Sequence, residues 1–434
     1  MDKMADVLGR AGAWCGQNKY LSAIKNAFQN FMPLTIAGAI GVLWCNVLVN
    51  DQTGLGLFFK PIMALDFLNP AFQAVNFCTI SCITVGITLG IAQEIGVWNM
   101  GAERAGYIPG LVGLAAWLSV TNTSHMVDGA KEAFTGIAGN ELGATGLFTG
   151  MIIGVLSVEL FCFFEKQDAL KIKMPEQVPP GVARAFEVLV PATITLIITA
   201  CIGSACYNLT GLYLNDVIKN GIQGPLGAVG ATVPGVMIIY LVIMLFWLVG
   251  IHGNNMLSAV KEALFTPLAL ENVEKFNKGE KPTNIINMYA LQMWGEFGGS
   301  GVTIGLVIAI MIFGKREDNK AIATLSLVPG LFNINETVTF GIPMVLNPIL
   351  GIPFVVAPLI TIIIGYVLTV IGFCPVACLT VPWTTPPIVF GFLACGANVM
   401  GAVTQAILIV VSTVIYVPFL ISYEKYQNKQ AAEA

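Results

Sequence analysis

The fold class follows from residues 229–250, which read VGATVPGVMIIYLVIMLFWLVG and contain no charged side chain. A helix needs about 20 predominantly apolar residues, within a range of about 17–25, to cross the hydrocarbon core of a membrane. Similar stretches recur along the chain, and we expect further spans at residues 31–49, 71–92, 106–121, 144–164, 186–206, 297–313, 352–373 and 400–422. The sequence therefore predicts an all-α polytopic membrane protein.

The composition supports the same class. Of 434 residues, 56% are hydrophobic and only 11% are charged, whereas a soluble domain carries about 25% charged residues. The net charge of −4 does not indicate a nucleic-acid partner. The ten cysteines lie almost entirely in apolar stretches without a C-x-x-C pair, which is typical of small buried side chains. We expect no disulfide, no metal site and no cofactor.

Lysine and arginine indicate the orientation and the domains. The N-terminal segment is basic, and residues 165–184 contain Lys166, Lys171, Lys173 and Arg184. Positive loops stay in the cytoplasm, so the N-terminus is expected there. Within the first half, Glu159 and Glu165 approach this basic loop and are expected to pair with it. We divide the chain into a surface amphipathic segment (1–30), an N-terminal transmembrane domain (31–206), an amphipathic connector (207–228), a C-terminal transmembrane domain (229–423) and a cytoplasmic tail (424–434).

The second half does not alternate cleanly across the membrane. One basic region holds Lys261, Lys275, Lys278 and Lys281, a second holds Lys315, Arg316 and Lys320, and a single clear apolar stretch separates them. Both regions can be cytoplasmic only if a segment enters and leaves on one side. Polar, Gly and Pro residues interrupt the apolar runs at 250–268 and 329–348, and such interrupted pairs are the best sequence indication of a transport site.

Glu336 and His252 are the foremost candidates for chemistry. A carboxylate at membrane depth is costly unless it is paired or hydrated, so Glu336 is expected to face a cavity. The alternative is a structural role, in which Asn335 or Glu336 caps a half-helix. His252 lies in Gly-Ile-His-Gly-Asn-Asn, where a titratable imidazole and Asn254 break an apolar segment. Its alternative role is that of a hydrogen-bonded core histidine.

Three further residues complete the candidate site. Glu296 lies in Trp-Gly-Glu-Phe-Gly-Gly-Ser-Gly, where the glycines allow either a ligand or a helix to approach closely. Trp294 and Trp383 lie outside the obvious interfacial ends of the spans. Sugar rings have apolar faces and polar rims, so a site for them combines an aromatic platform with amide, imidazole and carboxylate groups. Packing or interfacial anchoring is the alternative for each tryptophan.

At these residues the chain resembles the lactose/cellobiose/diacetylchitobiose family of phosphotransferase-system (PTS) enzyme IIC sugar transporters, over nearly its whole length. The resemblance is carried by the segments 174–186 (MPEQVPPGVARAF), 250–253 (GIHG), 297–303 (FGGSGVT) and 332–348 (FNINETVTFGIPMVLNP), of which the last is the most specific. One departure is the charged sequence that follows Gly253.

The resemblance implies about ten transmembrane helices plus two re-entrant hairpins, in an elevator-type two-domain transporter of the bacterial cell membrane. It implies a homodimer held through the N-terminal half, with a β-linked disaccharide, cellobiose or diacetylchitobiose, bound in the C-terminal half. His252 and Glu336 would contact the sugar near the hydroxyl that becomes phosphorylated. The phosphoryl group would come from a cysteine on a separate cytoplasmic IIB protein, which is itself supplied by IIA.

Under this hypothesis Glu336 is the general base and His252 orients the hydroxyl or offsets the incoming charge. His252, Asn254, Trp294, Glu296, Asn335, Glu336 and Trp383 form the substrate site. The first alternative is a proton-coupled secondary sugar transporter that uses Glu336 and His252 as a relay. The second is a sugar sensor or membrane scaffold that binds without translocation.

Overall fold

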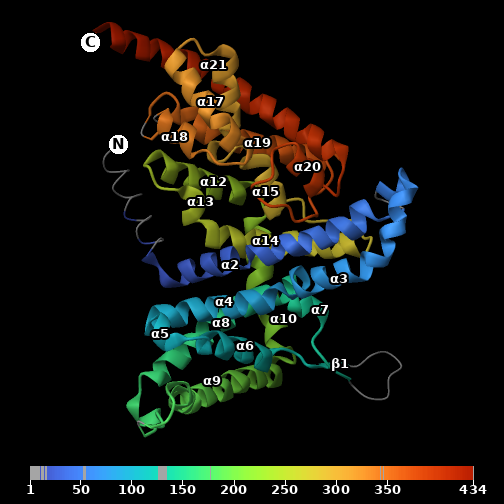
Figure 1. Ribbon diagram of the computed structural model, residues 1–434, viewed down its shortest axis with the longest axis vertical. Helices are drawn as coiled ribbons and strands as arrows, with labels where there is room; N and C mark the ends of the chain where they lie inside the picture. The colour runs from blue at the N-terminus through green and yellow to red at the C-terminus, as the bar shows by residue number, and fades with distance from the viewer. Residues whose placement is uncertain are drawn as a thin grey trace. The chain divides into compact units, whose positions relative to one another are not determined.

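The computed structural model describes residues 10, 14, 17–51, 55–125, 134–175, 177–342, 344, 345 and 347–433. The chain divides into two compact units. The N-terminal unit consists of residues 17–38 and 74–227, and the C-terminal unit consists mainly of residues 39–73 and 228–434. Both are helical, and the described residues contain one antiparallel pair of two-residue strands, in which Ser124 faces Thr135 (Figure 1).

The N-terminal unit is built around three helices. Here α4 (Ile83–Met100) packs against both α6 (Ile108–Val120) and α8 (Ala144–Glu165), and α9 (Pro180–Thr210) covers α6 and α8. A Cβ atom at Gly113 would overlap Ala92, and one at Gly150 would overlap Thr88. Small residues thus allow close helix approach, as is common in membrane bundles.

The remaining elements of this unit are α2 (Lys19–Leu43), η4 (Ile80–Cys82), α5 (Ala102–Ala105), β1 (Ser124–His125), β2 (Phe134–Thr135), α7 (Gly139–Leu142), η5 (Asp168–Leu170), α10 (Leu214–Ile218), η6 (Lys219–Gln223) and α11 (Gly224–Gly230), of which α2 and α11 continue beyond it.

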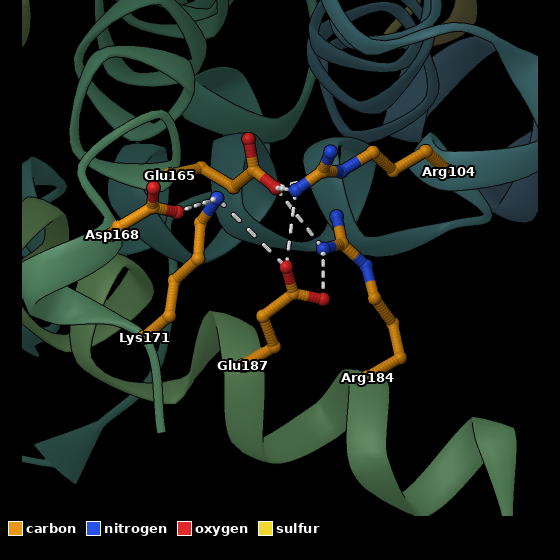
Figure 2. A network of polar contacts seen from close by, with 6 residues as sticks. All are labelled: Arg104, Glu165, Asp168, Lys171, Arg184 and Glu187. Atoms are coloured by element: carbon orange, nitrogen blue, oxygen red, sulfur yellow. Dashed lines mark hydrogen bonds and ion pairs between the residues drawn. The ribbon is translucent and has the colours of Figure 1, made fainter. Parts of the chain in front are cut away.

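A network of charges joins the ends of α5, α8 and α9 (Figure 2). Glu165, whose side chain is 4% exposed, accepts hydrogen bonds from Arg104 Nε and Arg184 Nη1, both at 3.0 Å. The same two arginines donate to Glu187 at 3.0 and 2.9 Å, and Lys171 lies between Glu187 and Asp168. Elsewhere in this unit Glu159 pairs with Lys19 at 2.6 Å. The prediction of pairing with the basic loop is confirmed for Glu165, which binds Arg184. It is wrong for Glu159, whose partner Lys19 lies in the N-terminal segment.

The C-terminal unit contains the longer set of elements. In chain order they are η1 (Trp44–Leu48), η2 (Leu55–Leu57), η3 (Lys60–Leu68), α3 (Asn69–Cys78, which continues into the N-terminal unit), α12 (Val233–Leu248), α13 (Gly253–Met256), α14 (Ser258–Asn277), α15 (Met288–Gly295), η7 (Ser300–Val302), α16 (Ile304–Phe313), α17 (Glu317–Leu331), α18 (Glu336–Gly341), α19 (Gly351–Val370), α20 (Val389–Ala394) and α21 (Val399–Glu433).

Helix α21 connects much of this unit (Figure 1). It packs along α16, α19 and α20. Gln405 near its start accepts from the backbone N–H groups of Ile388 and Gly391, at 2.7 and 2.8 Å. Further along, Tyr416 donates its hydroxyl to Gly301 O at 2.8 Å, and Glu424 accepts from the backbone N–H of Lys315 at 2.8 Å. One helix therefore holds three separate segments through buried polar side chains.

Six helices among the described residues are long and apolar enough to cross a membrane. They are Lys19–Leu48, Lys60–Met100, Ala144–Glu165, Pro180–Thr210, Gly351–Val370 and Val399–Glu433. A seventh span is formed if Met288–Val302 and Ile304–Phe313, which are bent by 59°, are counted together. The expected spans at 106–121 and 229–250 are helices of only 13 and 16 residues, α6 and α12. The chain is an all-helical integral membrane protein, as the sequence predicts.

The two expected interruptions differ in form. In the first, the break is confined to the residues before Ser258, because α14 then runs through Pro267 without a gap. The second is a gap between two helices, in which α17 ends at Leu331 and α18 begins at Glu336. Residues 19–30, which the sequence analysis assigns to the amphipathic segment 1–30, are the first turns of α2, and most of residues 1–16 lies outside the described residues.

Candidate functional site

His252 owes its position to a sharp turn at the end of α12. Gly250 has a φ of 83°, a left-handed conformation that favours glycine. His252 then caps α13, and its Nδ1 accepts a hydrogen bond from the Asn255 N–H at 3.2 Å. A neutral imidazole must therefore carry its proton on Nε2. The Trp247 ring packs against the imidazole with 4.4 Å between ring centroids.

Glu336 lies opposite that nitrogen. Its Oε1 is 3.8 Å from His252 Nε2, and the two side chains are 47% and 37% exposed. Glu336 is the first residue of α18, a helix of six residues. The two strongest sequence candidates, 84 positions apart, thus face the same exposed region of the C-terminal unit.

Two asparagines fix the segment that carries Glu336. Asn335 is 4% exposed, and its side-chain amide donates to Ser300 O at 2.8 Å and Thr339 Oγ1 at 3.2 Å. Asn333 has a φ of 63°, which asparagine tolerates better than most residues. Its Oδ1 accepts from the Gly298 N–H at 2.6 Å, while its Nδ2 donates to the backbone oxygens of Trp383 and Thr385.

The Gly-Gly-Ser-Gly sequence is the loop on which these asparagines rest. Gly298, Gly299 and Gly301 have φ values of 70°, 88° and 79°. A Cβ atom at Gly299 would overlap Asn335, and one at Gly301 would overlap Phe354. Of the two alternatives for these glycines, the structure shows close packing of protein against the loop.

Glu296 lies beneath the surface rather than on it. Its side chain is 17% exposed, accepts from the Tyr240 hydroxyl at 2.7 Å and forms an ion pair with Lys261. Lys261 also donates to Asn254 Oδ1 at 3.2 Å, and Asn254 Nδ2 donates to Ser300 Oγ at 2.9 Å. Lys261 is 6% exposed, so it does not share the surface of the basic region in which the sequence groups it with Lys275, Lys278 and Lys281. An ammonium paired in the interior carries no information about the side of the membrane.

The two tryptophans have different environments. Trp383 is 44% exposed, and its backbone oxygen is held by Asn333 beside the start of α18. Trp294 is 1% exposed and packs against Gly365, where a Cβ atom would overlap the indole ring. Trp383 is therefore available as a platform for a ligand, and Trp294 packs inside the unit.

Several residues of this arrangement escaped the sequence analysis. Lys261, Ser300, Asn333 and Tyr240 all bind predicted site residues. Asn333 lies in the same Asn-Ile-Asn-Glu sequence as Asn335 and could have been identified with it. Tyr240 carries no sequence signal beyond a single hydroxyl in an apolar helix. The complete site is a carboxylate, an imidazole and an exposed indole supported by an amide network, which suits a polyhydroxyl ring.

Known proteins are similar to this chain over most of its length. The sequence model of the family described as "Phosphotransferase system, EIIC" matches residues 25–358. The chain is 32% identical to the oligo-beta-mannoside-specific EIIC component of Bacillus subtilis (strain 168), covering 98% of this chain and 94% of that protein. It is 30% identical to the cellobiose-specific EIIC component of Lactococcus lactis subsp. lactis (strain IL1403), covering 98% of each.

A solved structure is similar over the same length. The transporter ChbC, the IIC component from the N,N'-diacetylchitobiose-specific phosphotransferase system, superposes with a TM-score of 0.88 at 29% identity, covering 97% of both chains. The chain belongs to the phosphotransferase system EIIC family. The family expected from residues 174–186, 250–253, 297–303 and 332–348 is thereby confirmed.

Proposed function

We propose that this chain is the sugar-translocating subunit for a β-linked disaccharide, cellobiose or diacetylchitobiose, whose entry is coupled to phosphorylation by a separate IIB phosphocysteine protein. The printed specificities of its relatives, oligo-beta-mannoside, cellobiose and N,N'-diacetylchitobiose, support a β-linked substrate. The observation that carries the proposal is the facing pair of His252 and Glu336, 3.8 Å apart on an exposed region.

That distance suits a single hydroxyl oxygen. Hydrogen bonds of about 2.8 Å to each partner place one oxygen between Nε2 and Oε1, accepting from the imidazole and donating to the carboxylate. Glu336 then takes the hydroxyl proton as the oxygen bonds to phosphorus, while the P–S bond of the IIB phosphocysteine breaks and the cysteine thiolate leaves. His252 orients the attacking oxygen. Phosphoryl transfer depends largely on positioning and charge, which a fixed pair supplies.

The remaining contacts are assigned to the groups nearest this pair. Trp383 forms the platform for a sugar ring, Asn254 supplies an amide group at its rim, and the buried Asn335 completes the site by holding the segment of Glu336. Glu296 supports them from below, and Trp294 stabilises the unit by packing.

For the whole assembly we propose ten transmembrane helices and two re-entrant hairpins, with the N-terminus in the cytoplasm. Residues 31–206 hold a homodimer together. Residues 229–423 carry the sugar across as a rigid body, with 1–30, 207–228 and 424–434 as surface segments. The similarity to ChbC covers 97% of both chains, which supports a shared fold along all of these segments.

Proteoliposomes test the function. They are loaded with phosphoenolpyruvate and the soluble phosphotransferase proteins, including a IIB, and a panel of β-linked disaccharides is added outside. The proposal requires sugar phosphate in the lumen only when IIB is present. Free sugar that accumulates under an imposed proton gradient, without ester, would establish the proton-coupled transporter instead. Binding without any uptake would indicate a sensor.

A further inference from the structure

Lys261 is a buried cation that the proposed chemistry does not use. Its side chain is 7% exposed and pairs with Glu296, and its ammonium lies 5.6 Å from the centre of the Tyr240 ring. A buried ion pair adds little net stability, because desolvation offsets the attraction between the charges. A residue of this kind within a membrane protein indicates a role beyond stability.

A series of hydrogen bonds leads from Lys261 through Asn254 and the two oxygens of Ser300 to Asn335, the residue before Glu336. The ammonium donates to Asn254 Oδ1, and Asn254 Nδ2 donates to Ser300 Oγ. Ser300 O in turn accepts from the side chain of Asn335, the residue directly before Glu336. Asn254 itself lies two positions after His252. Lys261 is therefore connected to both members of the facing pair and touches neither.

The chemistry of the ammonium group gives this series a direction. Lysine can only donate hydrogen bonds, so the Asn254 amide must present its oxygen to Lys261 and its NH₂ group to Ser300. A neutral side chain at position 261 removes this constraint and lets the amide rotate. The charge on Lys261 thus fixes which groups of the polar surface donate and which accept.

We propose that Lys261 is a positioning residue of the sugar site. It orients Asn254 and, through Ser300 and Asn335, keeps the side chains of His252 and Glu336 facing each other. This inference rests on the proposed function for the nature of the ligand. It concerns the binding of the sugar before any phosphoryl transfer, so the role of Lys261 and the coupling to phosphorylation can be tested separately.

The test is calorimetric binding of cellobiose and diacetylchitobiose to the purified full-length protein in nanodiscs. Lys261→Met with Glu296→Gln removes both charges and leaves no unpaired buried ion. We expect Kd to rise at least tenfold while the thermal unfolding midpoint changes little. The matched control is Lys278→Met with Glu274→Gln, an exposed ion pair of the same helix region, which should leave Kd unchanged.

Two further variants keep the test decisive. Lys261→Arg retains a donor-only cation and should bind within about threefold of the wild type. In an Asn254→Leu background, neutralising Lys261 and Glu296 should cause no further loss, because residues that act through one another are not additive. An additive loss would show that Lys261 or Glu296 acts on the sugar by another route.

The outcomes separate the two proposals. If the wild type binds disaccharide and the neutralised variant binds equally well, Lys261 is structural and the inference is overturned. If the wild type binds but forms no ester with IIB, the coupling to phosphorylation fails while the binding comparison still decides the role of Lys261. A wild type that binds no β-linked disaccharide overturns both.

Discussion

The side-chain amide of Asn333 donates to the backbone oxygen of Trp383, so the turn before Glu336 and the loop bearing the exposed indole are joined. The same side chain reaches the Gly298 N–H and Thr385 O. Three segments far apart in the sequence therefore meet at one residue. The relative position of the carboxylate and the aromatic platform depends on it.

Asn333→Gly should weaken disaccharide binding at least tenfold. Glycine accepts the φ of 63° without strain, so the variant removes only the side-chain hydrogen bonds. Two of these bonds are partly buried, and loss of a buried hydrogen bond costs about 1–3 kcal/mol of stability for each group left unpaired. Calorimetric Kd and the thermal midpoint, measured together, check this. If Kd is unchanged, Asn333 does not align the two segments.

Glu336→Gln should reduce IIB-dependent ester formation about 10²–10⁴-fold, the usual contribution of a general base. The amide keeps the size of the side chain, so sugar binding should stay within a few-fold of the wild type. Single-turnover phosphorylation and equilibrium binding distinguish the two effects. Glu317→Gln, at an 87% exposed carboxylate of α17, is the control. Equal loss of binding and phosphorylation would contradict the general-base role.

Trp383→Ala and Trp294→Ala should have opposite phenotypes. The indole of Trp383 is 44% exposed, so its removal should abolish much of the sugar affinity and leave the unfolding midpoint nearly unchanged. Trp294 is buried, and its removal leaves a cavity that lowers the free energy of unfolding by about 3–5 kcal/mol. Thermal unfolding measures the change in stability, and tryptophan fluorescence with added sugar measures the change in affinity. A sugar-dependent quench that survives in Trp383→Ala would remove Trp383 from the site.

Arg184→Met should destabilise the N-terminal unit without altering sugar affinity. The substitution leaves Glu165, 4% exposed, with Arg104 as its remaining partner in the charged network. Removing one partner of a buried pair costs about 3–5 kcal/mol, and the second arginine should reduce that loss. Thermal unfolding and Kd are the measurements, with Lys166→Met as an exposed control. A weakened Kd would mean that this network acts on the sugar site.

The sequence alone predicts the membrane class, and it picks out two foremost candidates for the site for a physical reason. A carboxylate and an imidazole inside apolar stretches are costly, so His252 and Glu336 stand out as single residues. That they face each other is a tertiary fact, which apolar periodicity does not contain. Only the resemblance placed both at the same sugar.

The errors have equally specific causes. Counting charges along the chain grouped Lys261 with the lysines of a basic region, because its partner Glu296 is 35 positions away. Trp294 and Trp383 look alike in the sequence, but Trp294 is buried against Gly365, where the absence of a Cβ atom leaves room for its indole ring. The short lengths of α6 and α12 likewise reflect turns at their ends, such as the left-handed Gly250, that hydropathy does not register.

The three anchors on α21 have a consequence for biosynthesis. Gln405, Tyr416 and Glu424 bind segments that leave the ribosome earlier, and domains generally form as the chain emerges from its N-terminus. The glycine loop and the residue Lys315 before α17 therefore lack their hydrogen bonds to Tyr416 and Glu424 until the final helix is inserted. A premature stop before Gln405 would leave Glu336 and Trp383 on an unfinished scaffold, the kind of nascent product that membrane quality control removes.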